Sequence, residues 1–308
     1  MKIINAHVHL IELQKMLQQN PDMEISLELE VFKNLDQTLS LLEPRKLFEQ
    51  MDEAGVGQAV LFACEAPIVY SSNEYVAALC RQFPDRLIGF ASVNPLRDDA
   101  ADVIEHAVTH LGLKGIKFHP PLQDFYPDDE RVFPVYERAV ELNVPAVFHV
   151  GTTPFGAMAK LDQANPLLLD TVACAFPDLR IMLTHLGTLW HNEAFMVTEK
   201  NRNVFIDTAA YLYEIRALLN NNLIERLGAD KFIFGTDYPM PFGNQSHRMK
   251  DFVDCVASLD LAEDIKEKIF FRNFAVLMNG REHKTLTAGQ MMQALGGGAM
   301  GAGTGPGS

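Results

Sequence analysis

The order of elements along the chain predicts an α/β protein built as a closed barrel of eight parallel strands that alternate with helices. Short apolar or β-branched runs alternate with amphipathic stretches as far as about residue 280. The runs are apolar without interruption, as in parallel strands buried on both faces. The first run is followed by His-Val-His-Leu, where an open doubly wound sheet would usually carry a glycine-rich phosphate loop. Together these observations favour the closed barrel.

The elements follow from the hydrophobic pattern and from the residues that end each helix. Strands are expected at residues 2–8, 58–63, 87–93, 114–118, 144–149, 180–185, 203–207 and 231–236. Helices are expected at residues 43–54, 73–83, 98–111, 132–142, 167–176, 190–200, 213–219 and 261–279. Pro84, Pro145 and Pro177 lie between a helix and the next strand, where proline ends a helix without removing a sheet hydrogen bond. The arrangement is that of a (β/α)8 TIM-type barrel spanning residues 1–280.

Two segments depart from the repeat. Residues 10–42 form an overlong connection after the first strand, and we expect a loop-and-helix insertion that covers the barrel mouth. Residues 281–308 form a C-terminal extension that ends in a glycine-rich run, and we expect it to be flexible.

Charge, hydrophobic runs and cysteine content limit the kinds of partner and the cellular compartment that we expect for this protein. The formal charge of −14 argues against nucleic-acid or anionic-membrane binding. The chain has no run of about 18 apolar residues, and it starts directly with a strand rather than a secretory signal. Its four cysteines lack CxxC spacing and lie in apolar segments, so we expect buried, reduced thiols and a cytoplasmic protein.

Two histidines separated by one residue, His7 and His9, end the first predicted strand. Side chains two apart on a strand point to the same face, so both imidazoles are expected to emerge together from its C-terminal end. An isolated pair of this kind is usually structural, but it also provides half of a metal site.

Later strands end in similar side chains. Barrel enzymes draw their reactive groups from the C-terminal ends of several strands. Those ends carry His119, His149, His185 and Asp237. Taken singly, each histidine has an ordinary reading as a hydrogen-bonded core residue, and the aspartate as a turn residue. Burying all of them together would be costly unless a cation organised them, so their convergence predicts a metal centre.

At these strand ends the chain resembles the amidohydrolase superfamily, specifically its amidohydrolase-related (amidohydrolase 2) group. The resemblance rests on the motifs NAHVH, GIKFHP, FHVG, THLG, FGTDYP and the closing NFAVL. It implies one divalent ion held by His7, His9, His149 and Asp237, with Zn²⁺ expected and Mn²⁺ or Fe²⁺ as alternatives. It also implies that Asp237 moves a proton and that His185 acts as an acid or base toward the substrate.

Lys117 shares a strand face with His119, and both are expected to contact substrate. Some superfamily members carboxylate a lysine at this strand to bridge two metals, which would make His149 and His185 ligands of a second ion. An unmodified Lys117 would instead suit a substrate carboxylate, or form a structural ion pair inside the barrel. Asp207 and Asn94 are expected to hydrogen-bond to the ligands. Weaker candidates for substrate contact are Glu65, Tyr211, Trp190 and His191.

The resulting prediction is a metal-dependent hydrolase that cleaves an amide, lactone or ester bond of a small molecule, with or without a carboxylate, using a metal-activated water. The alternative is a non-oxidative decarboxylase resembling aminocarboxymuconate-semialdehyde decarboxylase. A second alternative is a catalytically inactive metal-binding barrel. The partner in each reading is a small molecule, and a homodimer is left open.

Overall fold

The strands form a closed parallel barrel in the computed structural model, which describes residues 1–21, 40–239, 248–280 and 290–291. In neighbour order the barrel strands are β1 (Ile4–His9), β2 (Gln58–Phe62), β5 (Leu87–Phe90), β6 (Ile116–Phe118), β7 (Ala146–Phe148), β8 (Ile181–Leu183), β9 (Val204–Asp207) and β10 (Phe232–Ile233). They pair in two parallel groups, β1-β2-β5 and β6 to β10.

Backbone pairs at two seams join these groups into a ring. At the first seam Ala91 pairs in parallel with Ile116, and the Lys117 amide donates to the Ala91 carbonyl at 2.7 Å. At the second seam Val8 pairs in parallel with Tyr238, and the His9 amide donates to the Tyr238 carbonyl at 2.7 Å. Because the first and last strands meet, the predicted barrel is confirmed.

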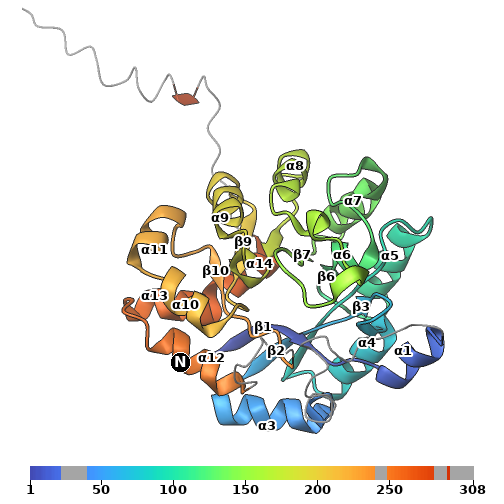
Figure 1. The fold of residues 1–308 in the computed structure, drawn as a ribbon, viewed down its shortest axis with the longest axis horizontal. Helices are drawn as coiled ribbons and strands as arrows, with labels where there is room; N and C mark the ends of the chain where they lie inside the picture. Colours follow the sequence, from blue (N-terminus) through green and yellow to red (C-terminus); the bar gives the residue numbers. More distant parts are fainter. Residues whose placement is uncertain (22–39, 240–247, 281–289, 292–308) are drawn as a thin grey trace, which may run out of the picture.

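Helices surround the strands as an outer ring (Figure 1). The helices are α1 (Leu13–Gln19), α3 (Pro44–Ala54), α4 (Asn73–Gln82), α5 (Ala100–Thr109), α6 (Pro120–Gln123), α7 (Phe133–Glu141), α8 (Leu168–Ala175), α9 (His191–Lys200), α10 (Leu212–Leu218), α11 (Asn221–Leu227), α12 (Met249–Ala257), α13 (Glu263–Glu267) and α14 (Asn273–Asn279). None of the described helices is both long and apolar enough to cross a membrane.

Local sequence sets the ends of these helices. Helix α3 starts with Pro44 in its first turn and ends at Gly55, whose φ of 70° lies in the left-handed region that glycine adopts without strain. Helix α4 starts after Ser72, whose hydroxyl accepts a hydrogen bond from the Tyr75 amide. Short 3-10 turns lie at Glu130–Val132, Gly156–Met158, Leu161–Ala164 and His185–Gly187, and a π turn at Lys268–Arg272.

Several elements differ from the sequence prediction. The expected helix 261–279 is made of α13, the π turn and α14. Helices α11 and α12 were not predicted, nor was the antiparallel pair β3 (Cys64–Glu65) and β4 (Tyr70–Ser71). Of the predicted insertion, α1 lies in the described part, whereas residues 22–39 lie outside it, as does nearly all of the extension 281–308. The four cysteines are free, but Cys174 is exposed, so the expected burial is wrong there.

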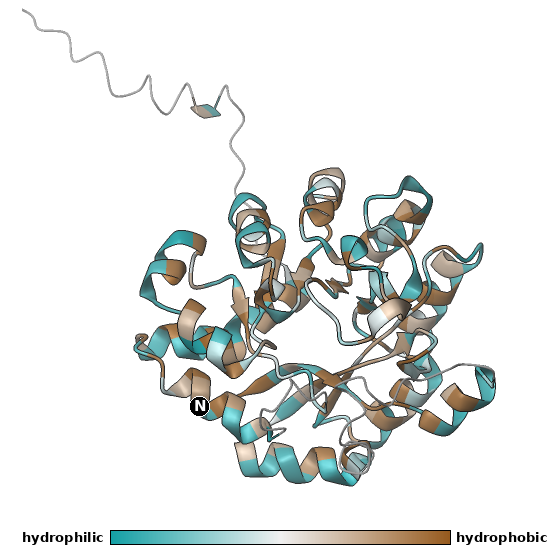
Figure 2. Ribbon diagram, viewed as in Figure 1, coloured by the Kyte–Doolittle hydropathy of each residue, from teal (hydrophilic) through white to brown (hydrophobic). Residues whose placement is uncertain are grey.

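The core has two layers. Apolar residues lie on the strands at the centre, and polar residues lie on the outer faces of the helices (Figure 2). The interior of the barrel is filled by inward side chains, namely Ile4, Ala6, Val60, Phe62, Phe90, Val147, Met182, Phe205 and Ile233. The alternate residues, such as Leu61 and Phe148, pack outward among the buried faces of the helices.

Strand β1 contains an irregularity that decides where its histidines point. Its register against β2 shifts between Asn5 and Val8, where β1 uses one more residue than its partner. Such a bulge changes the alternation of faces. Ile4 and Ala6 therefore fill the barrel interior, and His7 and His9 line the pocket at its C-terminal end. The Phe62 ring, centred 4.9 Å from the His7 ring, separates the apolar interior from the histidines.

Candidate active site

Side chains from five strand ends line one pocket at the C-terminal end of the barrel. The pocket encloses about 50 Å³ and is lined by His7, His9, Val69, Lys117, His119, His149, Thr153, Pro154, Phe155, His185 and Asp237. The residues predicted to form the site are therefore brought together, and the apolar members form part of its wall.

Three of the predicted ligands are in direct contact. His7 Nε2 lies 3.0 Å and His9 Nε2 3.3 Å from Asp237 Oδ1, and the two imidazole nitrogens are 3.2 Å apart. The three side chains are among the buried polar residues, and their ligand atoms all lie within 4.8 Å of one another. Two imidazoles and one carboxylate form a donor set that suits a divalent metal ion.

The protonation states of His7, His9 and Asp237 depend on one another. Burial opposes protonation of His7, but the Asp237 and Asp207 carboxylates outweigh burial and raise the pKa of His7. Burial lowers the pKa of His9 to about 4. Burial also acts to raise the pKa of Asp237, but its contacts with His7 and His9 hold that pKa well below the usual range. An ionised carboxylate thus faces two imidazoles, and either a proton on His7 or a metal ion can balance it.

Asp207, at the end of β9, holds the first histidine in place. Its Oδ2 accepts from His7 Nδ1 at 2.7 Å, and its Oδ1 accepts from the amides of His185 and Ala209 at 2.7 and 3.0 Å. Because a carboxylate can only accept, His7 Nδ1 carries a proton, and Nε2 faces Asp237, to which it donates when the ring is protonated and beside which it offers a lone pair to an ion when the ring is neutral. The expected hydrogen bond between Asp207 and a predicted ligand, His7, is present.

Asn5 links the first strand to the segment after β10. Its amide donates to Thr236 Oγ1 at 2.7 Å, and its Oδ1 accepts from the amides of Thr236 and His7 at 3.1 and 3.2 Å. Gly235 allows the close approach, since a Cβ there would lie 2.9 Å from His7 Cβ. Asp237 follows with a left-handed φ of 55° that brings its carboxylate to the histidines. Sequence reasoning did not identify Asn5.

His185 and His149 form a second hydrogen-bonded pair across the pocket. His185 Nδ1 donates to the Ala209 carbonyl at 2.6 Å, and its Nε2 lies 3.0 Å from His149 Nδ1. Burial lowers the pKa of both imidazoles. A neutral His185 that donates through Nδ1 accepts at Nε2, so His149 must donate through Nδ1. His149 Nε2 is then a buried lone pair, and it has no hydrogen-bond partner among the described residues.

The position of His149 differs in one respect from the expected ligand set. Within the described residues, the close groups of potential ligand atoms are His7–His9–Asp237 and His7–His185–Asp207, and His149 belongs to neither. Its ring is instead stacked on His119, with centroids 4.0 Å apart and an interplanar angle of 9°. His149 thus shares the pocket and presents a free nitrogen, but it does not touch the three-residue group.

Side-chain hydrogen bonds stabilise the turn that carries His185. His185 and Leu186 have left-handed φ values of 62° and 49°. Thr188 Oγ1 lies within hydrogen-bond distance of both the His185 carbonyl (2.8 Å) and Glu214 Oε2 (3.1 Å). His191 Nδ1 donates to the Leu186 carbonyl at 2.8 Å, and its Nε2 lies 3.3 Å from Glu214. These bonds maintain a backbone conformation that non-glycine residues rarely adopt.

Other candidates are not among the residues that line the pocket. Asn94 bonds to the Gln123 carbonyl and to Glu65, and among the described residues its expected bond to a predicted ligand is not made. Glu65 also pairs with Arg97 at 2.7 Å. Gln123 was missed, although it connects three loops through the His119 amide and the carbonyls of Glu65 and Val93. A glutamine in a short helix carries no signal of such a role.

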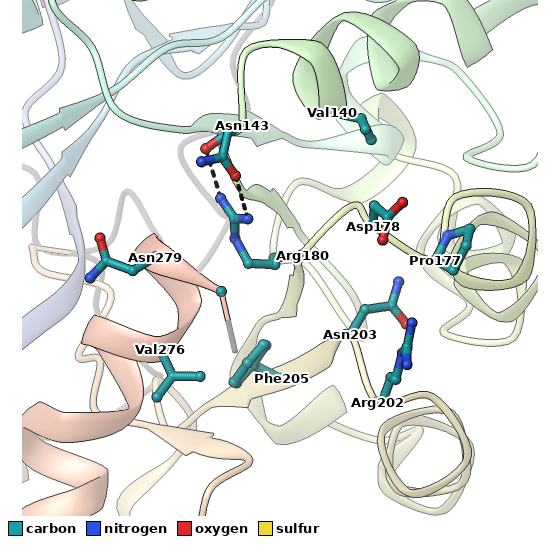
Figure 3. Close-up of a pocket in the computed structure, with 11 residues that line it drawn as sticks. Val140, Asn143, Pro177, Asp178, Arg180, Arg202, Asn203, Phe205, Val276 and Asn279 are labelled. Carbon is teal, nitrogen blue, oxygen red and sulfur yellow. Dashed lines mark hydrogen bonds between the residues drawn. The ribbon is translucent and has the colours of Figure 1, made fainter. Parts of the chain in front are cut away.

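A larger pocket, of about 250 Å³, opens at the opposite end of the barrel (Figure 3). Its central cation, Arg180, is engaged by Asn143, with two hydrogen bonds of 2.7 Å, and by the carbonyls of Leu277 and Met278 at the end of α14. Arg180 therefore ends a helix and anchors a loop, and this pocket is not the candidate site.

Comparisons with known proteins agree with this assignment of the fold. Residues 4–274 match the family described as Amidohydrolase. The gamma-resorcylate decarboxylase of Polaromonas sp. JS666 is 24% identical and is aligned over 72% of this chain and 83% of its own. The 2-keto-4-carboxy-3-hexenedioate hydratase of Sphingobium sp. SYK-6 is 27% identical and is aligned over 67% of this chain and 70% of its own. A crystal structure of the Polaromonas dihydroxybenzoic acid decarboxylase with bound manganese and 2-nitroresorcinol superposes with a TM-score of 0.68 at 19% identity, covering 90% of this chain and 96% of that one.

These relatives overturn the predicted hydrolase. Decarboxylases release carbon dioxide and hydratases add water to a double bond, so neither reaction hydrolyses an amide, lactone or ester. The prediction was wrong because the strand-end motifs report which ion-binding side chains converge. They do not report which substrate bond breaks. The preference for zinc is likewise not supported, since the ion in the similar structure is manganese.

Proposed function

The chain belongs to the amidohydrolase family, and from this membership we propose that it is a metal-dependent, non-oxidative decarboxylase of a small carboxylic acid. One observation carries the proposal: the buried contact of His7, His9 and Asp237 in a pocket whose other lining residues include buried polar atoms that lack a partner in the described part of the chain. The decarboxylases among the relatives favour this reaction over hydrolysis.

The proposed ion site consists of His7, His9 and Asp237, with His149 as the fourth donor. Two observations support a fourth donor there: His149 Nε2 is buried, and it lacks a partner among the described residues. Mixed nitrogen and oxygen donors accept manganese as well as zinc, and manganese is the ion in a similar structure. A divalent ion at this place would stabilise negative charge that develops on substrate oxygens.

Asp237 and His185 are assigned the proton transfer and the positioning of the substrate. In decarboxylation the bond between the substrate carbon and its carboxylate breaks, carbon dioxide leaves, and the electron pair stays on that carbon until it accepts one proton. We assign this proton transfer to Asp237, which is itself part of the proposed ion site and, being ionised at rest, must first take up a proton. Its proton comes from solvent and is replaced once in each turnover. His185, fixed by Asp207 and Ala209, would position the substrate by hydrogen bonding.

The test is the reaction of the manganese-loaded protein with 2,6-dihydroxybenzoate and 5-carboxyvanillate in D₂O. We expect carbon dioxide and a product that carries one deuterium at the vacated carbon. His149→Ala should lose both bound manganese and activity, whereas Asn94→Ala, which alters a residue outside the pocket lining, should keep its manganese. Finding that 2-keto-4-carboxy-3-hexenedioate is hydrated while neither acid loses carbon dioxide would replace this proposal with a hydratase.

A further inference from the structure

One wall of the pocket carries a cation that no described residue neutralises through a direct contact. Lys117 is 1% exposed, and its Nζ has no hydrogen-bond partner among the described residues. The centroid of the Phe62 ring lies 5.3 Å from Nζ. An ammonium group buried without a partner is costly, and most buried lysines are paired.

Two neighbours of this ammonium share the same condition. The hydroxyl of Thr153 and Nδ1 of His119 are buried and lack partners within the described part of the chain, and both residues line the pocket with Lys117. We call Lys117, His119 and Thr153 the anion subsite. Donors that remain unsatisfied together in one pocket indicate a ligand group that accepts several hydrogen bonds and carries negative charge.

We infer that the anion subsite binds a second carboxylate of the substrate, the one that stays on the product, so that the substrate is a dicarboxylic acid. This inference rests on the proposed function. The carboxylate that leaves must lose its charge in the reaction, and an ion pair that stabilises it in the ground state would oppose that loss. An ion pair to the other carboxylate holds the substrate through a group that does not react.

The charges of the pocket agree with this arrangement. Asp207 and Asp237 provide two negative charges on the His7 side, which balance a divalent ion and leave Lys117 uncompensated. Burial lowers the pKa of Lys117 to about 8, so the ammonium is still predominantly charged at neutral pH. The wall also contains Val69, Pro154 and Phe155, apolar residues that suit the carbon skeleton between two acid groups.

Binding calorimetry on the manganese-loaded full chain tests this inference. The probes are isophthalate and glutarate, which hold two carboxylates at the same separation in rigid and flexible form, with benzoate and butyrate as their single-carboxylate counterparts. We expect the wild-type protein to bind at least one diacid about tenfold or more tightly than its counterpart. Lys117→Met should abolish this preference without weakening the monoacids, and Thr153→Val should reduce it.

Lys114→Met is the matched control, since it removes the same charge from an exposed position three residues earlier and should keep the preference. Equal binding of diacids and monoacids by the wild-type protein would overturn the inference, as would a preference that survives Lys117→Met. The proposed function fails separately. Carbon dioxide release from 2,6-dihydroxybenzoate without diacid preference leaves the decarboxylase and removes the subsite. If the protein prefers diacids but releases carbon dioxide from none of the diacids or monoacids, the subsite is kept and the decarboxylase is removed.

Discussion

Replacing Lys117 with methionine should make the metal-free protein more stable, although it removes a residue of the anion subsite. The folded protein holds the pKa of Lys117 at about 8 because the side chain is buried, against an ordinary value of 10.5. This difference corresponds to about 3 kcal/mol that the folded state loses at neutral pH by keeping the ammonium charged. Methionine has a similar unbranched shape and no charge, so it avoids this loss without leaving a cavity.

The sign of the pH dependence follows from the two pKa values. Between about 8 and 10.5 the unfolded chain binds more protons at this lysine than the folded protein does, so the stability of the wild-type protein rises with pH there. The advantage of the methionine variant should therefore be largest near neutral pH and should fall to about 1.5 kcal/mol near pH 9.5.

Urea unfolding of both proteins in EDTA, followed by circular dichroism at the two pH values, measures this difference. A gain of about 3 kcal/mol corresponds to a shift of about 1 M in the urea midpoint for a chain of this size. A variant that is equally stable or less stable at neutral pH would refute the reasoning. An advantage that did not shrink at the higher pH would show that packing, rather than charge, was responsible.

Two further predictions concern proton transfer and the His185 turn. Asp237→Asn keeps an oxygen donor but cannot carry the proton, so bound manganese should be partly retained while kcat falls by about 10² or more; an unchanged kcat would exclude Asp237 as the proton donor. Glu214→Gln removes a carboxylate that raises the pKa of His191 against the opposing effect of burial. The stability from a raised histidine pKa is complete below the ordinary value of 6.5 and is lost as pH rises through the folded value. The variant should therefore be less stable than the wild-type protein near pH 5.5, and the two stabilities should converge above about pH 8. Urea titrations at both pH values measure this difference. An equal loss of stability at both would assign Glu214 a role independent of charge.

The sequence was sufficient for the ring of strands because each barrel strand is a short apolar run closed by turn residues. It also predicted that His7, His9 and Asp237 would lie together, since strand ends meet at one face of a barrel. It did not predict the bulge in β1. A regular strand would place His7 on the opposite face from Ile4, and only the register shift after Asn5 lets β1 fill the barrel and supply the pocket.

Contacts made by ordinary polar residues were also beyond the sequence. Glu214 occupies the third position of α10, where an acidic residue usually stabilises the helix start, and nothing in the pattern ties it to a turn between β8 and α9. The reaction was misjudged for a related reason. Hydrolysis and decarboxylation can use the same ligand set, so the motifs at the strand ends do not separate the two reactions.

The bond between Asn5 and Thr236 joins residues that are 231 positions apart along the chain. During synthesis the N-terminal strand therefore emerges long before Asp237, and it offers an ion only its two imidazoles. A site missing its carboxylate binds divalent ions weakly, so in the proposed site stable metal capture would wait until the barrel closes. An ion held there by His7, His9 and Asp237 would connect the first strand to the segment after the last one. It would then stabilise the closed barrel as a whole, because it would have affinity for that state and little for the open chain.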